Sequence, residues 1–346
     1  MEIKEALKEL CELPGPAGFE ELVAKRAKEM LEPYMDETRI DVMGNVIGVR
    51  RCGKENAPKL LFDAHIDEIG FIVTGVEEGF VRFARLGGFD PRVIPASGVM
   101  IMTEPPLYGV VSVLPPHILK KEDTDKNFKI EDLYIDVGLT QEEAEKRIPP
   151  GTPGVPAHGV KDIGDNLICG KAIDDRAGFL AIMRALEMLK DVKLDIDLYV
   201  MASVQEEVGV RGATTGAYSI DPDYCVVIEV HHAKTPDAKP SEAHVELGKG
   251  VVIIRGPNMN PGFTESIVKT AADNEIKHQI SVMATGLSGT NARAIQVSRQ
   301  GVATALLGIP LKYMHSVTEL SSLDDMESTA KLLSETAKSM KGAVKS

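Results

Sequence analysis

Acidic residues and histidines recur in this sequence near the ends of predicted strands. His65 closes the apolar run at residues 59–65, and Asp67 follows two residues later. An imidazole at a strand end can bind a metal ion, and a carboxylate two residues on can accept its second ring N–H and fix the tautomer. The alternative is a histidine that only packs at the strand end. The motif therefore marks His65 as a candidate ligand and Asp67 as its partner.

Two pairs of adjacent acids are the next candidates. Asp174 and Asp175 precede a predicted helix, where Asp175 could act as a capping or first-turn acid and Asp174 stays free to bridge two ions. Glu206 and Glu207 follow the predicted strand at residues 196–203. Neighbouring carboxylates repel unless solvent or divalent ions offset their charge, and one could bind an ion while the other acts as a general base. The alternative for the glutamate pair is a solvated loop.

Glu229 and His315 complete the set. Glu229 lies inside the apolar run at residues 226–230, where a carboxylate is rarely buried without a partner. His315 follows a predicted strand, and its alternative is an ordinary loop histidine. His231 and His232 are not expected to be ligands, because successive strand residues point to opposite faces. Two histidines combined with strand-end carboxylates match the ligand chemistry of a two-ion zinc or cobalt site, which activates water.

The elements that position these residues predict an α/β domain with an insertion. A strand is expected over residues 40–49, and strands alternate with helices again after residue 165, which is typical of an α/β layered domain. Between residues 70 and 160, short apolar runs separated by Gly and Pro predict a small β-rich module with a charged, solvated loop at residues 120–132. We therefore predict a catalytic domain formed by residues 1–69 and 161–346, with an inserted domain at residues 70–160.

Composition excludes several classes of partner. The 346 residues include 39 Lys and Arg against 52 Asp and Glu, a formal net charge of −13. This acidity argues against sequence-independent nucleic-acid binding and against an anionic membrane as partner. No apolar run approaches the roughly 20 residues of a membrane span, and the N-terminus is a charged amphipathic pattern rather than a signal peptide. We expect a cytoplasmic protein.

Four motifs resemble those of a known family and occur in its order. They are HIDEIG at residues 65–70, AIDDR at 172–176, EEVGVRGA at 206–213 and YMHS at 313–316. The sequence resembles, nearly from end to end, the tetrahedral (TET) aminopeptidases and the related deblocking and glutamyl aminopeptidases, some of which carry the label endoglucanase. The resemblance implies a three-layer α/β peptidase domain with a mixed sheet flanked by helices, and an inserted barrel-like β-rich domain used for dimerisation. It also implies self-association as dimers and as a tetrahedral dodecamer.

The resemblance implies a role for each candidate. Two divalent ions per subunit, zinc or cobalt with manganese as a further option, would be held by His65, Asp174, Glu207, Glu229 and His315. Asp174 would bridge the ions. Glu206 would be the general base that takes the proton of the attacking water, and Asp67 would orient His65.

Two positions depart from the family pattern. Glu229 stands where the family usually has Asp, which keeps the charge but adds one methylene group. Asn291, in the stretch SGTNA at residues 288–292, stands where the family usually has Asp and removes one negative charge. We expect this loss near the presumed substrate pocket, where it would weaken capture of a free amine or of basic side chains.

The predicted activity is removal of N-terminal residues from short peptides, with a water bridging two metal ions and a glutamate as base. A glycosidase is one alternative, since it also needs two carboxylates. It does not need histidines paired with strand-end acids, and the chain has no Trp for a sugar platform. A metal-binding scaffold without catalysis, in which Glu229 has spoiled the site, is the other alternative. Loss of activity on chelation separates the peptidase from the glycosidase, and metal content without hydrolysis would identify the scaffold.

Overall fold

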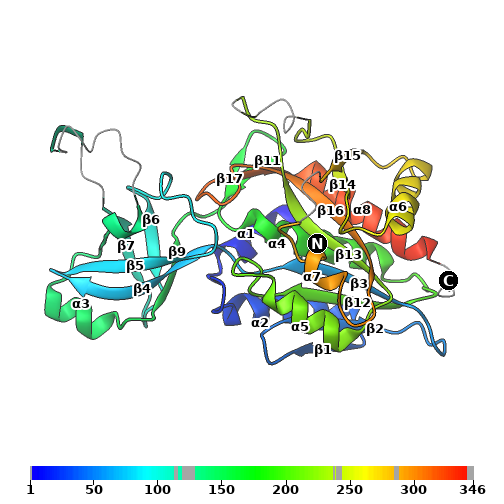
Figure 1. Cartoon of the computed structure of the whole chain (residues 1–346), viewed down its shortest axis with the longest axis horizontal. Coiled ribbons are helices and arrows are strands. Elements are labelled where there is room, and N and C mark those ends of the chain that lie inside the picture. The colour runs from blue at the N-terminus through cyan, green and yellow to red at the C-terminus, as the bar shows by residue number, and fades with distance from the viewer. Residues whose placement is uncertain are drawn as a thin grey trace.

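The chain forms a large α/β part and a smaller β-barrel that lie side by side (Figure 1). This computed structural model describes residues 2–112, 116–118, 129–236, 238, 244–283 and 288–340. Most of the charged stretch expected to be a solvated loop, residues 120–128, lies outside the described residues. Within the described part of the chain, no helix combines the length and the apolar character needed to cross a membrane.

The α/β part is built on one mixed sheet, in which the described residues contribute 11 strands. They are β1 (Glu37–Ile40), β2 (Val46–Arg50), β3 (Lys59–His65), β10 (Lys161–Ile163), β11 (Leu167–Gly170), β12 (Asp197–Ser203), β13 (Tyr224–His232), β14 (Val251–Arg255), β15 (His278–Val282), β16 (Ala303–Lys312) and β17 (Glu319–Ser322). The main path runs β1-β2-β12-β3-β13-β16-β17-β11-β10. Because β12, β3, β13 and β16 are mutually parallel along this path, their carboxyl ends share one edge.

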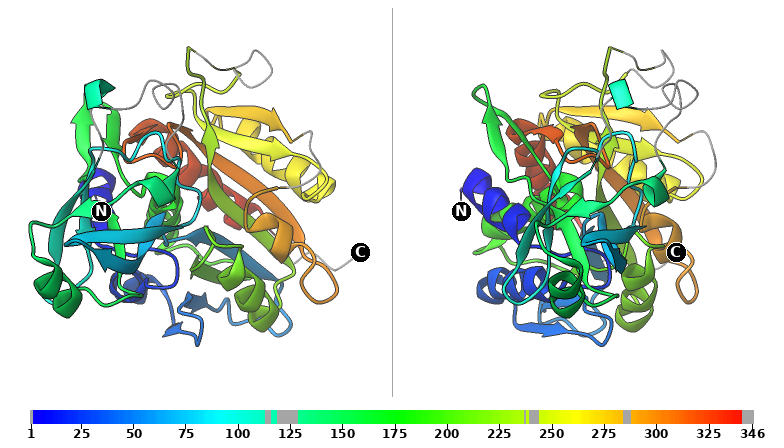
Figure 2. Two further views of the ribbon diagram at one scale, coloured as in Figure 1. Left: turned by 60° about the vertical axis from the view of Figure 1, so that its left-hand side comes forward. Right: turned by 90° about the vertical axis from the view of Figure 1, so that its left-hand side faces the viewer.

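Helices cover both faces of this sheet and complete three layers (Figures 1 and 2). One face packs against α1 (Ile3–Glu12), α2 (Glu21–Leu31), α4 (Ile173–Leu189), α6 (Pro261–Asp273) and α8 (Leu323–Ser339), and the short turn η1 (Glu32–Tyr34) follows α2. The other face packs against α5 (Arg211–Ile220) and α7 (Ala292–Ile295). Leu60 and Phe62 of β3 face the first layer and Leu61 the second. Strand alternation therefore puts His65 on the side of α5 and α7.

The barrel closes in the order β4-β5-β8-β7-β6-β9. Its elements are β4 (Gly70–Glu77), β5 (Phe80–Leu86), β6 (Gly98–Ile101), β7 (Leu107–Val111), η2 (Pro116–Ile118), η3 (Ile130–Asp132), β8 (Ile135–Asp136), α3 (Gln141–Arg147) and β9 (Pro153–Pro156). It has a hydrophobic core of its own, in which Phe71, Val99 and Ile135 are fully buried. In chain order the barrel stands between β3 and β10 of the sheet. The predicted fold class, an α/β layered part with an inserted β-rich barrel, is confirmed.

The stretch at residues 40–49, expected to be one strand, contains only the last residue of β1, a turn and most of β2, and these two strands pair as a hairpin. Asp41 starts its turn, because its carboxylate accepts the backbone N–H groups of Met43 at 2.9 Å and Asn45 at 3.0 Å. Gly44 adopts φ +103°, a conformation that favours glycine. The single-strand prediction is wrong because these local side-chain-to-backbone bonds end the strand.

A buried ionic cluster fixes the junction between sheet and barrel. Glu68 lies between β3 and β4, and its two carboxylate oxygens are 2.8 and 2.7 Å from Lys171 Nζ. Arg176 Nη2 also donates to Glu68, at 3.1 Å. All three side chains are at most 6 % exposed. Buried charges of this kind are tolerated only when they are paired, so Glu68 locks the start of α4 to the end of β3.

Arg176 extends the cluster to the N-terminal segment. Its guanidinium donates to the carbonyl oxygens of Leu10 and Leu13, at the end of α1, and to that of Ile66 at 3.1 Å. The first helix is thereby tied to the loop that follows His65.

Replacing Glu68 by Gln should lower the free energy of unfolding by about 3–5 kcal/mol, because two buried cations lose their counter-charge. Urea unfolding of the purified protein measures the change. Glu29→Gln is the control, because its exposed carboxylate pairs with Arg26 at 3.3 Å and should contribute less than about 1 kcal/mol. Equal effects of the two substitutions would contradict a structural role for the buried cluster.

Candidate metal centre

The predicted site residues converge at the carboxyl edge of the parallel strands, where open α/β sheets build their sites. His65 is the last residue of β3, and Glu229 lies in β13. The glutamate pair follows β12, Asp174 lies in the first turn of α4, and His315 lies between β16 and β17. Segments up to 250 residues apart thus reach one place.

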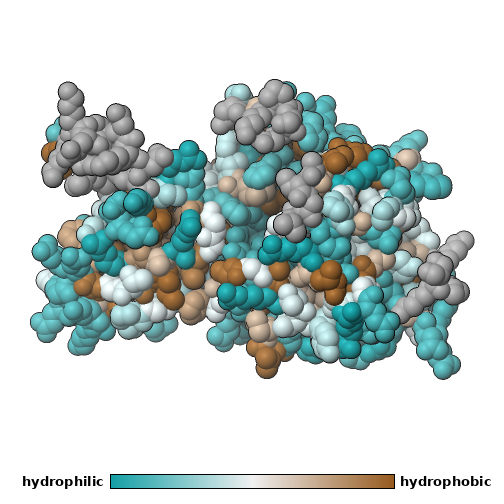
Figure 3. Space-filling model, viewed as in Figure 1, coloured by the Kyte–Doolittle hydropathy of each residue, from teal (hydrophilic) through white to brown (hydrophobic). Residues whose placement is uncertain are grey.

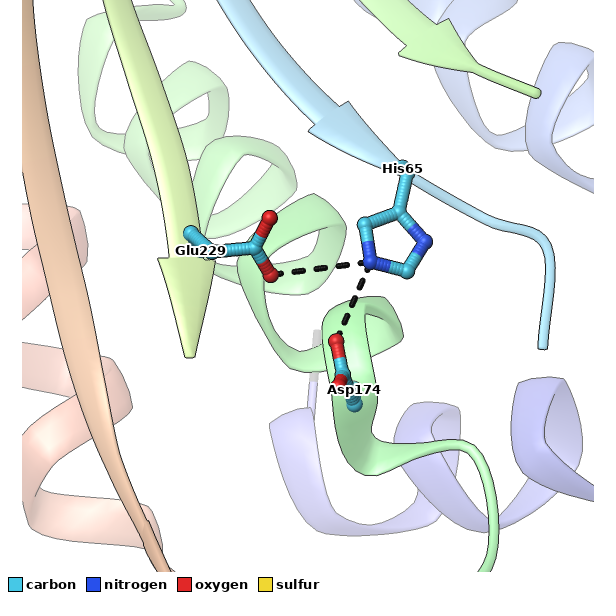
Figure 4. A group of neighbouring side chains, drawn as sticks. All are labelled: His65, Asp174 and Glu229. Atoms are coloured by element: carbon cyan, nitrogen blue, oxygen red, sulfur yellow. Dashed lines mark hydrogen bonds and ion pairs between the residues drawn. The ribbon is translucent and has the colours of Figure 1, made fainter. Parts of the chain in front are cut away.

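One group consists of His65, Asp174 and Glu229 (Figure 4). The Nε2 atom of His65 is 3.0 Å from Asp174 Oδ1 and 3.5 Å from Glu229 Oε1. All three residues are buried, and one potential ligand atom from each lies within 4.8 Å of the others. This group could hold a metal ion.

A second group consists of Asp174, Glu207 and His315. His315 Nε2 is 3.5 Å from Asp174 Oδ2 and 3.5 Å from Glu207 Oε2. Asp174 belongs to both groups and turns one carboxylate oxygen toward each. This is the placement that a bridging carboxylate needs.

The charges of the two groups suit cations. Burial disfavours the charged imidazole, but the negative charges of Glu229 and Asp174 outweigh it and raise the pKa of His65 well above its usual value. Burial, together with the charge of Asp174, raises the pKa of Glu207. Burial also raises the pKa of Glu229, against the influence of His65. The two groups contain more carboxylates than positively charged side chains. This ligand chemistry fits divalent metal ions.

Asp67 holds both His65 and the glutamate pair. It is fully buried, and its oxygens accept the backbone N–H groups of Glu206 at 3.0 Å and Glu207 at 3.1 Å. Nδ1 of His65 is 3.2 Å from the backbone oxygen of Asp67 and 3.4 Å from its carboxylate. The Asp67 carboxylate thus lies beside His65 and also links the end of β3 to the loop after β12.

Glu206 belongs to neither group. Burial, opposed by the positive charge of His65, raises its pKa to about 9. His231 and His232 also belong to neither group. His231 instead shares a hydroxyl with His244, since their Nε2 atoms are 2.8 and 3.1 Å from Ser281 Oγ.

The chain matches the model of the M42 glutamyl aminopeptidase family over residues 44–332. It belongs to this family. The predicted resemblance and the predicted aminopeptidase function are thereby confirmed, and metal dependence is typical of M42 peptidases.

Similar proteins agree with this assignment. The chain is 38% identical to the lysyl aminopeptidase of Pyrococcus furiosus, over 95% of this chain and 94% of that protein. It superposes on a TET aminopeptidase from Thaumarchaeota archaeon SCGC AB-539-E09 with a TM-score of 0.92 and 36% identity. The match covers 98% of this chain and 96% of that chain. The TET1 peptidase of Pyrococcus horikoshii, which can assemble into a tetrahedron or a large octahedral shell, gives a TM-score of 0.86 and 30% identity over 98% and 100%.

Glu319 is a buried carboxylate of this M42 peptidase that the sequence did not single out. It begins β17, accepts the backbone N–H of Asp174 at 3.1 Å and accepts that of His315 at 3.2 Å. Its only sequence signal is an acid at the start of an otherwise uncharged strand. Such a residue is expected to be solvated when only the sequence is known.

Asn291 is buried against β3 and β12, and its expected effect on capture of a free amine or of basic side chains stays a prediction. Its side chain is 1% exposed and donates to Asp63 Oδ2 and to Ser203 Oγ, both at 2.9 Å. A carboxyl group, that of Asp63, thus lies next to Asn291. Burial raises the pKa of Asp63 to about 7, in spite of the hydrogen bonds from its neighbours.

The segment directly after β5 of the barrel contacts the second group through Gly87 and Gly88. A Cβ atom on Gly88 would lie 2.5 Å from His315 Nδ1, and one on Gly87 would lie 3.2 Å from the Glu207 side chain. These positions leave no room for a larger residue, so the barrel and the sheet meet at the site.

Gly88→Ala should displace the His315 ring and lower kcat/KM at least about tenfold, the scale of loss seen when a ligand is misoriented. Hydrolysis of an aminoacyl-anilide measures it. Gly75→Ala, also in the barrel, is the control, because a Cβ there meets nothing within 4 Å. Unchanged activity in Gly88→Ala would mean that this contact does not constrain His315.

Proposed function

We propose that this protein removes N-terminal residues from short peptides with a pair of divalent ions, zinc or cobalt, with manganese as a further option. One ion would be held by His65, Asp174 and Glu229, and the other by Asp174, Glu207 and His315. The observation that carries the proposal is the carboxylate of Asp174, whose two oxygens face the two groups at 3.0 and 3.5 Å from the histidines.

The chemistry that such ions supply when bound is a lowered pKa for an attacking water and polarisation of the scissile carbonyl group. Glu206 accepts the proton of that water and delivers it to the leaving amine. Asp67 keeps Glu206 in place through the backbone N–H of that residue.

We further propose that the protein self-associates through the inserted module at residues 70–160, as dimers and as a tetrahedral dodecamer. The TET1 peptidase of Pyrococcus horikoshii forms a tetrahedron, which supports this assembly. Apolar side chains gather on the visible face of the barrel (Figure 3). Tyr108 and Val110 of β7 are 55% and 41% exposed, and apolar exposure of this kind is typical of a surface that is covered in an assembly.

Glu206→Gln should keep both ions and lower kcat by about 10²–10⁴, because the amide cannot accept the proton. Metal content by mass spectrometry and hydrolysis of aminoacyl-anilides measure the two effects separately. Glu207→Gln is the comparison, since loss of a proposed ligand should lower metal content as well. A Glu206→Gln enzyme with wild-type kcat would rule Glu206 out as the base.

Chelation should abolish aminopeptidase activity, and added Zn²⁺, Co²⁺ or Mn²⁺ should restore it. A screen over aminoacyl-anilides with neutral, acidic and basic side chains, run in parallel with a soluble cellulose, measures both candidate activities. Cellulose hydrolysis that survives chelation would support the glycosidase instead. Stoichiometric metal without hydrolysis of any anilide would support the scaffold and overturn the proposal.

A further inference from the structure

Glu319 contacts the backbones of two proposed ligands at the same time. Its side chain is buried at 1% exposure, and each of its two oxygens accepts one backbone N–H, from Asp174 and from His315. These two residues come from different segments, the first turn of α4 and the loop between β16 and β17. One carboxylate therefore sets the spacing of both.

The backbones that Glu319 holds are irregular. His315 adopts φ +59°, a left-handed conformation that is unfavourable for a residue other than glycine and persists only when neighbours enforce it. Asp174 has φ −71° and ψ 112°, outside the helical range, although it lies within the bounds of α4. A buried N–H in such a place needs an acceptor from elsewhere in the structure. Glu319 provides it for both.

Glu319 contacts two members of the second group, whereas Asp174, which both groups share, is its only contact in the first. Asp174 and His315 are two of the three members of the second group, whose third member, Glu207, is held through Asp67. Among the described residues, His65 and Glu229, which complete the first group, donate no hydrogen bond to Glu319. Loss of Glu319 should therefore disturb the second group more than the first.

We propose that Glu319 is a positioning residue that sets the affinity of the second group for its ion. The inference rests on the proposed function, because it needs two ions in the two groups. It assigns Glu319 no contact with the ion or the substrate, and its effect passes through the backbones of Asp174 and His315.

Asp325 offers a matched control in the same part of the chain. It is a fully buried carboxylate near the start of α8, and it accepts the backbone N–H groups of Gly248 and Gly250, both at 2.7 Å. Like Glu319, Asp325 accepts two backbone N–H groups with one carboxylate, but the residues that it holds lie outside the metal groups.

The test is Glu319→Gln in the full chain, stripped of metal and titrated with Zn²⁺ and with Co²⁺. The amide keeps the shape of the side chain but presents a donor to one of the two N–H groups, so one hydrogen bond is lost. We expect the Kd of one ion to rise about 10–100-fold, the usual effect of losing a residue that orients a ligand, while the Kd of the other changes less than about threefold. Calorimetry gives both constants, and the visible absorption of Co²⁺ follows each site as it fills.

Asp325→Asn should lower thermal stability while leaving both Kd values unchanged. If Glu319→Gln leaves both Kd values at the wild-type level, or raises both by the same factor, Glu319 is not a selective positioning residue and the inference is wrong. Should the Gln variant not fold, Glu319→Asp is titrated instead, since it keeps the acceptor but is too short to span both amides, and the same selective loss is expected. A wild-type chain that binds fewer than two ions overturns the proposed function itself, which distinguishes that failure from a wrong role for Glu319.

Discussion

The constraint on which the rest of this structure depends is the burial of many carboxylates at one edge of the sheet. Removing a carboxylate from water costs several kcal/mol unless a cation or a set of N–H donors replaces the solvent. Glu68 is matched by Lys171 and Arg176. Asp67 and Glu319 are matched by backbone N–H groups. Three further acids, Asp174, Glu207 and Glu229, face the two histidines, and a pair of divalent ions would neutralise their charge.

The same constraint explains how distant segments are held together. Several buried carboxylates accept backbone N–H groups from loops at this edge of the sheet. Asp67 fastens the loop after β12, Glu319 fastens α4 to the loop after β16, and Glu20 accepts the N–H of Gln205 at 3.1 Å. Burial raises the pKa of Glu20 to about 7, in spite of this bond. The loops therefore owe their conformation to the acids beneath them, including the left-handed backbone of Gln205 at φ +55°.

The sequence was sufficient to predict the fold class and the set of candidate residues, for a physical reason. Alternation of apolar runs reports which faces of a strand are buried, and a carboxylate such as Glu229 inside an apolar run is conspicuous. What the sequence could not predict are contacts between segments. Glu319 is indistinguishable from a surface acid until β17 is placed beside α4. Asn291 meets Asp63 across a sequence separation of 228 residues. The roles of the individual ligands stay predictions, because proximity alone does not assign them.

The two metal groups differ in how far their histidines are exposed, and therefore in how accessible they are from solvent. The His65 side chain is 2% exposed, whereas that of His315 is 37% exposed. The first group is formed by two strands and the first turn of α4, within the body of the sheet. The second is bounded by the barrel at Gly88 and by Glu319 from behind. His315 is therefore the more solvent-accessible of the two histidines, at the place where barrel and sheet meet. The closeness of the barrel to His315 and Glu207 explains why two consecutive glycines occupy the segment after β5.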